Sequence, residues 1–265
     1  MLTFRDFITG LRKLEIDHVR PVIAHASLSA FSEVHGGAET VLGVLSSAFN
    51  TLVMPAFTYK TMIIPEVGPP ANAITYGSGR ATNRMAEIFR ADMPADKMMG
   101  VVAEALRTHP KAYRSSHPIL SFVGINARSI LDSQSIKEPL LLVQKILEQD
   151  GWVLLLGVDQ TANTSIHYAE QLAGRRSFIR WALTPKGVIP CQRFPGCSDG
   201  FEALTPRLEM FVRKVELGEA LIQAIRLADL VDVVTGVLKE NPLALLCGRE
   251  DCERCDTVRT SIAVQ

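Results

Sequence analysis

The sequence predicts an α/β fold in which a mixed sheet is flanked by helices and carries a small β-rich insertion. Strand-like runs alternate with segments of helical periodicity along the 265 residues, which is the pattern of α/β proteins. One run, "GWVLLLGV", is apolar apart from its glycines, as expected for a strand covered on both faces. The periodicity weakens over 175–212, where we expect the insertion. No linker-like composition interrupts the chain, so we expect residues 1–265 to form a single domain.

The first part of the chain predicts alternating helices and strands. The segment "FRDFITGLRKLEI" places Phe4, Phe7, Leu11 and Leu14 at helical spacing, which indicates an amphipathic helix. A short apolar run over 22–24 predicts a strand. The elements expected next are a helix after the glycine pair of "VHGGAETVLGVLSSAF", a buried strand in "TLVMPAFT" and a long irregular stretch over 59–83. Irregular segments of that length usually line functional sites.

The remaining chain continues the alternation. The expected elements are helices over 83–92 and 97–108, a strand near 119–124, a helix in "LLLVQKILEQ", the buried strand in "GWVLLLGV" and a long helix in "GEALIQAIRLADLVDVVTGVLKEN". Strands that alternate with helices favour the α/β class over an all-β or all-α fold.

Composition and charge exclude several classes of partner. Lys and Arg together number 28, as do Asp and Glu, and the isoelectric point is near 7.0. No overall field therefore attracts nucleic acid or an anionic membrane. No apolar run reaches the ~18 residues of a membrane span, and the N-terminal segment lacks the apolar block of a signal peptide. We therefore expect a cytoplasmic protein, and the sequence gives no indication of its number of subunits.

Three polar segments carry possible chemistry. In "HASLSAFSEVHGGAETV", Gly36 and Gly37 precede a helix, so backbone N–H groups could approach an anion such as a phosphate. The spacing matches neither the Walker pattern nor the dinucleotide fingerprint, and a tight turn without a ligand is the alternative. His25 and His35 are equally open to both interpretations.

The second segment, "YRSSHPILSF", concentrates donors just before a predicted strand. It contains Arg114, Ser115, Ser116, His117 and Ser121. A ligand role is one interpretation. The alternative is an arginine clamp together with a hydrogen-bonded core histidine.

The third segment, "NTSIHYAEQLAG", follows the most strand-like run of the chain. Asn163, Thr164 and Ser165 can cap a helix that begins near His167. The i,i+3 spacing then places Glu170 beside His167, where a carboxylate can orient the ring of a general base. A surface His–Glu pair without a function is the alternative.

Together the three segments closely resemble the aminoglycoside 3-N-acetyltransferase family over roughly residues 20–180. That family has His-x-Ser-Leu and Gly-Gly-Ala with Thr-Val after it, then Arg-Ser-x-His-Pro-x-x-Ser-Phe, then an apolar strand closing on Asn-Thr and His-x-x-Glu. The matching positions in this chain are His25, Ser27, Leu28, Gly36, Gly37, Ala38, Thr40, Val41, Arg114, Ser115, His117, Pro118, Ser121, Phe122, Asn163, Thr164, His167 and Glu170.

The resemblance implies an acetyltransferase with a fold unrelated to GNAT enzymes, which uses acetyl-CoA to acetylate an amine. It implies that His167 is the general base and that Glu170 holds its imidazole ring in place. The coenzyme would contact residues of the first two motifs, namely His25, Ser27, Leu28, Gly36, Gly37, Ala38, Thr40, Arg114, Ser115, His117 and Ser121.

The acceptor is harder to predict from the residues. A polycationic aminoglycoside needs carboxylates, and the chain offers Glu66 in the loop over 59–83 and Asp159 after the buried strand. A small metabolite amine is the alternative acceptor. A non-catalytic, zinc-stabilised binding protein is the alternative function, while a metal-dependent hydrolase is disfavoured because the chain has no H-E-x-x-H motif.

Three of the five cysteines crowd into "CGREDCERC" near the C-terminus. Cys247, Cys252 and Cys255 have zinc-knuckle-like spacing, and Cys197 is the expected fourth ligand, with Cys191 as the alternative. A structural zinc site with no catalytic position is one interpretation. Reduced thiols without a metal are the other.

Overall fold

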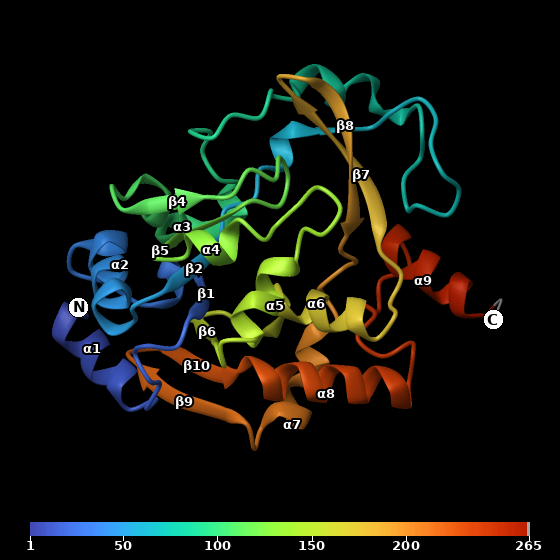
Figure 1. The fold of residues 1–265 in the computed structure, drawn as a ribbon. Helices are drawn as coiled ribbons and strands as arrows, with labels where there is room; N and C mark the ends of the chain where they lie inside the picture. Colours follow the sequence, from blue (N-terminus) through green and yellow to red (C-terminus); the bar gives the residue numbers. More distant parts are fainter. Residues whose placement is uncertain (264–265) are drawn as a thin grey trace.

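The computed structural model describes residues 1–263 and contains a seven-stranded mixed sheet with helices on both faces (Figure 1). The strand order is β4-β5-β2-β1-β6-β10-β9. The three central strands are parallel, and they are β2 (Leu52–Pro55), β1 (Val22–Ala26) and β6 (Trp152–Leu156). Every residue of these strands is buried, which explains their continuous apolar sequences.

Antiparallel strands extend the sheet on both sides of this centre. Beyond β2 lie β5 (Phe122–Ile125) and β4 (Ala112–Arg114). Beyond β6 lie β10 (Ala220–Arg226) and β9 (Val212–Leu217). The predicted class, a mixed sheet between helices, is therefore confirmed.

Alternating side chains of the central strands build two apolar cores. Ile23 and Val53 face one core, which is completed by α5 (Leu141–Leu147), α6 (Ser165–Leu172) and α8 (Leu227–Glu240). Their neighbours Val22 and Leu52 face the opposite core, which is completed by α1 (Phe4–Arg12), α2 (Gly37–Ala48) and α3 (Gly100–Thr108). The period of two along each strand thus divides the helices between the two faces.

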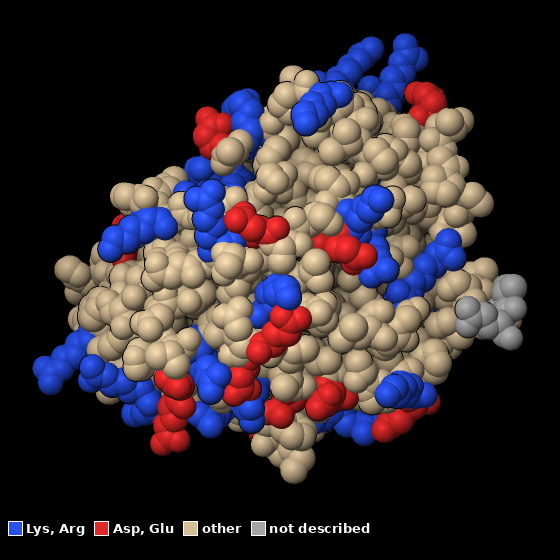
Figure 2. Space-filling model, viewed as in Figure 1, with Lys and Arg blue, Asp and Glu red and all other residues tan. Residues whose placement is uncertain are grey.

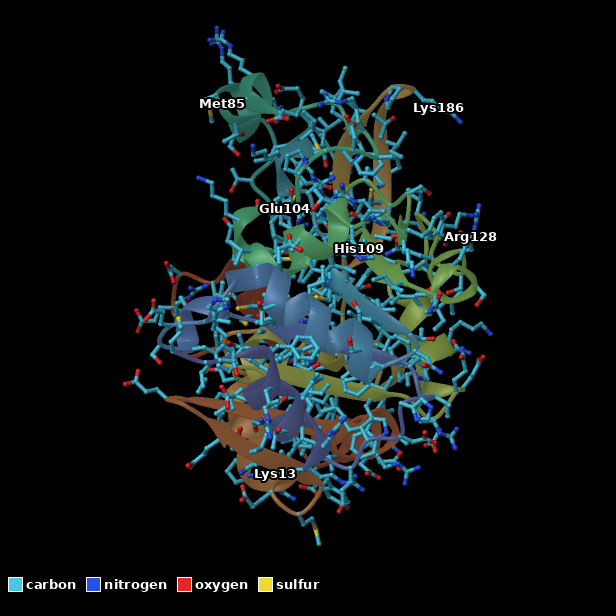
Figure 3. All side chains as sticks on the ribbon, turned by 90° about the vertical axis from the view of Figure 1, so that its left-hand side faces the viewer. Lys13, Met85, Glu104, His109, Arg128 and Lys186 are labelled. Carbon is cyan, nitrogen blue, oxygen red and sulfur yellow. The ribbon has the colours of Figure 1, made fainter. Side chains whose placement is uncertain are left out.

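A second, three-stranded antiparallel sheet confirms the expected β-rich insertion. It consists of β3 (Met62–Ile63), β7 (Phe178–Thr184) and β8 (Gly187–Phe194). In Figure 1 it projects from one end of the main sheet, and in the side view of Figure 3 Lys186 and Met85 lie at this end, far from Lys13. The irregular loop over 59–83 supplies its edge strand β3.

Short helices and turns complete the chain. These are α4 (Arg128–Leu131), α7 (Thr205–Leu208), α9 (Glu253–Ala263) and the 3₁₀ turns η1 (Leu28–Ala30), η2 (Tyr59–Thr61), η3 (Ser78–Arg80), η4 (Thr82–Met85), η5 (Lys97–Met99), η6 (Gln160–Ala162) and η7 (Phe201–Leu204). Figure 2 shows acidic and basic side chains intermixed over one face of the molecule. Among residues 1–263, no helix has both the length and the apolar character needed to cross a membrane.

One predicted helix is wrong, and a second begins later than predicted. Over 83–92 only the short turn η4 is helical. The backbone N–H groups of Glu87 and Phe89 donate to the carbonyls of Lys60 and Leu183, which lie far away in the sequence, and not to carbonyls within the segment as a helix would require. The long helix expected after residue 218 begins only at Leu227, because the preceding residues pair with β6 as the strand β10. Tertiary pairing overrides the local pattern in both cases.

Candidate active site

A cleft of about 410 Å³ opens where the parallel strands β1 and β2 end. This is the edge at which ligands usually bind in open α/β sheets. Its lining comes from the ends of β1, β2 and β8, the turn η5, the segment from β6 into α6, and α9. The residues are His25, Ala26, Met54, Pro55, Phe57, Tyr59, Met98, Met99, Val158, Thr161, Ala162, Asn163, Thr164, His167, Phe194, Pro195, Gly196, Ser198, Asp199 and Arg254.

The first turn of α6 brings the predicted pair together. Nδ1 of His167 lies 2.8 Å from Oε2 of Glu170, and the two side chains are only 9% and 6% exposed. The ring of Phe201 packs against the imidazole, with ring centroids 4.8 Å apart. Because Nδ1 is engaged by the carboxylate, Nε2 is the nitrogen left for a substrate in the cleft. Of the three expected capping residues, Asn163 is the one whose side chain bonds to the helix start, its Oδ1 accepting from the Ser165 N–H at 3.2 Å.

His25 lies in the same cleft at the end of β1. Burial lowers the pKa of its imidazole to about 4, so the ring is neutral at physiological pH. Its Nε2 forms no hydrogen bond with any other part of the described chain.

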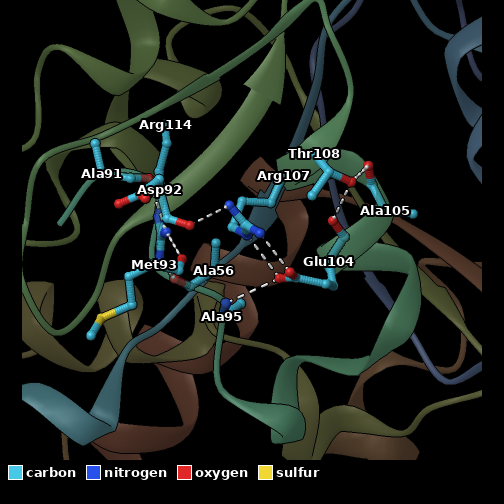
Figure 4. A network of polar contacts seen from close by, with 10 residues as sticks. All are labelled: Ala56, Ala91, Asp92, Met93, Ala95, Glu104, Ala105, Arg107, Thr108 and Arg114. Atoms are coloured by element: carbon cyan, nitrogen blue, oxygen red, sulfur yellow. Dashed lines mark hydrogen bonds and ion pairs between the residues drawn. The ribbon is translucent and has the colours of Figure 1, made fainter. Parts of the chain in front are cut away.

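The donors of Arg114 are used inside the protein (Figure 4). Nε donates to Oγ of Ser121 at 3.1 Å, Nη2 donates to the Ala56 carbonyl at 2.7 Å, and Nη1 donates to the carbonyls of Met93 and Ala91. Burial lowers the pKa of Arg114 to about 10. The arginine therefore ties the segment before α3 to the end of β2.

The neighbouring pair of Arg107 and Glu104 holds the same segment. Nη2 of Arg107 lies 2.6 Å from Oε1 of Glu104, Nη1 donates to the Asp92 carbonyl at 2.9 Å, and Oε2 of Glu104 accepts from the Ala95 N–H at 3.0 Å. Together with Arg114, this pair fixes the approach to the cleft-lining turn η5.

The other polar residues of the second motif also make internal bonds. Oγ of Ser115 accepts from the Phe122 N–H at 2.8 Å, and Oγ of Ser121 donates to the Ala56 carbonyl at 2.7 Å. Nδ1 of His117 accepts from the Leu120 N–H at 2.9 Å, and burial lowers its pKa to about 4. The cleft lining does not include these residues or Arg114, so their expected contacts with a coenzyme stay predictions.

The glycine pair has the backbone that a close approach requires. Gly36 and Gly37 have φ angles of +76° and +58°, and α2 starts at Gly37. A Cβ at Gly36 would lie 2.4 Å from Oγ1 of Thr40, whereas one at Gly37 would meet open space. Ala38 and Thr40, which follow this turn, are half-buried, as is Leu28 in η1.

An open groove of about 600 Å³ adjoins the cleft, and Val158, Thr161 and Ala162 line both. Its lining also includes Ser27 and three carboxylates, those of Asp159, Glu202 and Glu219. Glu66, the other predicted substrate residue, is exposed on its loop and lines neither cavity.

The structure gathers the predicted thiols beside the cleft. The Sγ atoms of Cys197, Cys247, Cys252 and Cys255 all lie within 4.8 Å of one another, and all four residues are buried. Cys191, the alternative ligand, lies on β8 outside this cluster. Residues next to the cluster, Gly196, Ser198 and Arg254, line the cleft. The thiol cluster therefore supports one wall of the site.

The thiols differ in their electrostatic surroundings. Burial opposes ionisation of Cys252, but hydrogen bonds from the Cys255 backbone and from neighbouring side chains lower its pKa to about 6. Burial raises the pKa of Cys197 to about 12.

The sequence model of the family described as aminoglycoside 3-N-acetyltransferase matches residues 23–239. The chain belongs to this family. The predicted resemblance is therefore confirmed, and acetyl transfer to an amine is the activity class of this acetyltransferase.

Individual relatives agree with this assignment. The acetyltransferase is 30% identical over 184 residues to the SPbeta prophage-derived aminoglycoside N(3′)-acetyltransferase-like protein YokD of Bacillus subtilis, covering 63% of this chain and 64% of that protein. It is 26% identical over 232 residues to aminoglycoside N(3)-acetyltransferase III of Salmonella sp, covering 77% and 79%. The chain thus spans just under two thirds of the first relative and more of the second.

Solved structures show the same fold. The apoenzyme of aminoglycoside acetyltransferase AAC(3)-IVa is 25% identical, with a TM-score of 0.79 and coverage of 98% of this chain and 97% of that one. AAC-IIIb, solved as a binary complex with CoASH, is 20% identical with a TM-score of 0.71, covering 90% and 97%.

Sequence reasoning missed three residues of this acetyltransferase site: Phe201, Arg175 and Arg254. Phe201 packs on the imidazole, and Arg254 enters the cleft from between two clustered cysteines. Nη1 of Arg175 lies 3.3 Å from Oε1 of Glu170. An arginine directly after the helix that carries a buried His–Glu pair is the one signal that could have been used, because a buried carboxylate needs a compensating charge.

Proposed function

We propose that this chain transfers the acetyl group of acetyl-CoA to the 3-amino group of an aminoglycoside. The observation that carries the proposal is the buried pair of His167 and Glu170, which opens into the cleft at the ends of the parallel strands. An imidazole held by a carboxylate, with one free nitrogen, has the form of a general base.

In the proposed reaction His167 takes the proton of the attacking amine. The nitrogen lone pair forms a bond to the thioester carbonyl carbon, and Nε2 of His167 accepts the proton that the amine loses. The C–S bond of the resulting tetrahedral species then breaks, and the thiolate of coenzyme A leaves. The imidazolium of His167 returns its proton to this thiolate, which regenerates the base. Glu170 stabilises the imidazolium that forms in between, as in other base–carboxylate pairs. No covalent acyl-enzyme is required.

The proposed coenzyme site is the turn before α2. The glycine pair leads into the positive end of a helix of 12 residues, an arrangement that favours phosphate. The Gly37 N–H donates to the Val34 carbonyl at 3.0 Å, so the donors for a phosphate would be the N–H groups in the first turn of α2. The proposed site also includes Ala38 and Thr40, which follow the glycine pair in α2, and Ser27 and Leu28, which follow β1. His25 lines the cleft, and the coenzyme contacts predicted for Arg114, Ser115, His117 and Ser121 remain part of this proposal.

The proposed acceptor site is the groove next to the cleft. Three carboxylates, Asp159, Glu202 and Glu219, line it, and they suit an acceptor that carries several ammonium groups. The groove shares Thr161 with the cleft that contains His167, so one amine of the acceptor can reach the base while others remain in the groove. A smaller amine of another class is the second candidate acceptor, because Arg254 places a positive charge in the cleft itself.

We also propose that the four clustered cysteines hold a structural zinc ion. Tetrahedral zinc with Zn–S bonds of about 2.3 Å requires sulfur atoms about 3.8 Å apart, and the four Sγ atoms lie within 4.8 Å of one another. Four thiolates would leave no open position, so such an ion would take no part in the reaction.

The test is release of free thiol from acetyl-CoA by the purified protein in the presence of single acceptors. Aminoglycosides that have a free 3-amino group should support release, whereas analogues with that amine blocked should not. Release with simple polyamines but with no aminoglycoside would reject the proposed acceptor and favour the second candidate. Use of acetyl-CoA fits the cytoplasmic location predicted from the sequence, which stays a prediction.

A further inference from the structure

The carboxylate of Glu170 has a different partner at each oxygen. Oε2 lies 2.8 Å from Nδ1 of His167, while Oε1 lies 3.3 Å from Nη1 of Arg175. The side chains of Glu170 and Arg175 are each only 6% exposed. The three residues therefore form a buried chain of imidazole, carboxylate and guanidinium that starts at the cleft.

Arg175 is held firmly in this position. Gly174, with a φ angle of +81°, turns the chain at the end of α6, and the backbone N–H of Arg175 donates to the Glu170 carbonyl at 2.9 Å. Nη2 donates to the carbonyls of Pro242 and Ala244 at 3.0 and 2.7 Å. Nη1 forms no hydrogen bond with any described residue, so it acts on Glu170 as a charge.

We propose that Arg175 is a positioning residue that keeps Glu170 ionised and His167 unprotonated before the acceptor binds. The inference rests on the proposed role of His167 as the base. A buried carboxylate next to an imidazole attracts a proton, because burial disfavours its charge. A guanidinium stays charged at any accessible pH, so it compensates Glu170 and lowers the pH at which the dyad takes up that proton. The dyad is then free to accept the proton of the amine.

Other titratable groups surround the dyad. His25, Tyr59, Asp199 and Arg254 line the cleft in front of His167. Behind it, burial lowers the pKa of Arg175, and the charges of Glu170 and Cys255 oppose this effect. Arg175 is the cation that ion-pairs with Glu170 in the described chain, so its removal should have the largest effect on the dyad.

The test is an NMR titration of the His167 imidazole in ¹³C-histidine-labelled protein, with the signal assigned by its loss in His167→Ala. Arg175→Gln retains amide donors for the Pro242 and Ala244 carbonyls but removes the charge. Its His167 midpoint should rise by about one pH unit or more, the effect of losing a close opposite charge from a carboxylate. Arg175→Lys, which keeps the charge, should restore most of this difference.

The matched control is Arg207→Gln, which breaks an exposed Arg–Glu pair with Nη2 of Arg207 2.8 Å from Oε2 of Glu240. It should leave the His167 midpoint unchanged. A midpoint in Arg175→Gln within a few tenths of a unit of wild type would overturn the proposal, even if activity or melting temperature fell. A purely structural arginine would give that result.

If Arg175→Gln does not fold, a second pair of variants decides. Glu170→Gln/Arg175→Gln removes both buried charges, a change that proteins tolerate better than loss of one partner. Its His167 midpoint should lie above that of Glu170→Gln alone, since a nearby cation is lost, and equal midpoints would reject the proposal. The titration needs no substrate, so absence of thiol release by the wild-type protein would reject the proposed function without deciding this inference.

Discussion

Glu170 lies one helical turn after His167 in α6, and its Oε2 approaches the imidazole Nδ1 to 2.8 Å in a setting that excludes solvent. The first prediction concerns this pair. His167→Ala should reduce kcat for thiol release by about 10²–10⁴-fold, because the general base is lost. Binding of acetyl-CoA, measured by calorimetry, should remain near wild type. Glu170→Gln should be milder, since it keeps the shape and loses only the charge.

The control for this experiment is His18→Ala. His18 is exposed and lies far from α6 in the sequence. This variant should be fully active. Retention of more than a tenth of the wild-type kcat by His167→Ala would remove His167 from the mechanism.

Carboxylates in the groove should set the affinity for cationic acceptors. Glu219→Gln and Glu202→Gln should each raise KM for an aminoglycoside about two- to fivefold, the size expected for a partly exposed charge pair, with little change in kcat. Added salt should reduce the difference between variants and wild type. Glu66→Gln is the matched control, because that carboxylate lies outside both cavities. If Glu66→Gln raised KM while the groove variants did not, the acceptor would bind over the loop containing Glu66 instead.

Purified protein prepared without added metal should contain about one zinc ion per chain by elemental analysis. Cys252→Ser should lose the metal and melt at a lower temperature, since the site joins the segment around Cys197 to the C-terminal helix α9. Cys191→Ser should keep the metal, because Cys191 lies outside the cluster. A zinc content below a few tenths per chain, with stability unchanged by chelation, would leave the cluster as reduced thiols.

Gly37→Val should weaken coenzyme A binding by blocking the backbone at the start of α2. It should also lower the melting temperature slightly, because Gly37 has a φ angle of +58° that a β-branched residue adopts only under strain. Gly187→Val is the matched control: its φ is +100°, a Cβ there would also meet open space, and it is the first residue of β8, just after the turn that joins β7 to β8. Equal coenzyme affinity in both variants would mean that the glycine pair forms only a turn.

The buried imidazole of His117 should make stability depend on pH. Burial lowers its pKa from 6.5 to about 4, so between these values the unfolded chain binds the extra proton. The contribution of this group to the free energy of unfolding is therefore fully present above pH 6.5. It decreases by roughly 3 kcal/mol as the pH falls towards 4. His117→Asn, whose oxygen can replace Nδ1 as the acceptor for Leu120, should flatten this part of the curve of melting temperature against pH. An unchanged slope would assign the effect to other groups.

The fold could be predicted where burial and local pattern agree. The strand β6 was predictable because its residues are apolar on both faces, and the helix α6 because capping residues precede an i,i+3 pair. The strand β10 was not, since Ala220–Arg226 is also compatible with a helix and only pairing with β6 makes it extended. The segment around Glu87 and Phe89 differs from prediction for the same reason, because its partners lie far away in the sequence.

The residues of the site divide in the same way, into those that local sequence reveals and those that only the tertiary structure reveals. His167, Glu170 and three of the clustered cysteines could be found because each group lies close together in the sequence. Cys197 could be matched to the cluster only by its chemistry. Arg175 and Phe201 were missed because their importance depends on where neighbouring elements place them. Arg114 has the residue type of an anion ligand, but its donors bind backbone carbonyls, which no sequence pattern reveals.

One wall of the cleft includes Arg254 in α9. This helix lies after residue 239, where the match to the family model ends. His167 and Glu170 are linked to that part of the chain through Arg175, whose Nη2 donates to the carbonyls of Pro242 and Ala244, and every amino acid supplies a carbonyl. The C-terminal segment can therefore diversify in evolution, or be exchanged by an engineer, with little disturbance of the base. Selection for a new acceptor can then act on the tail while His167 and Glu170 stay the same.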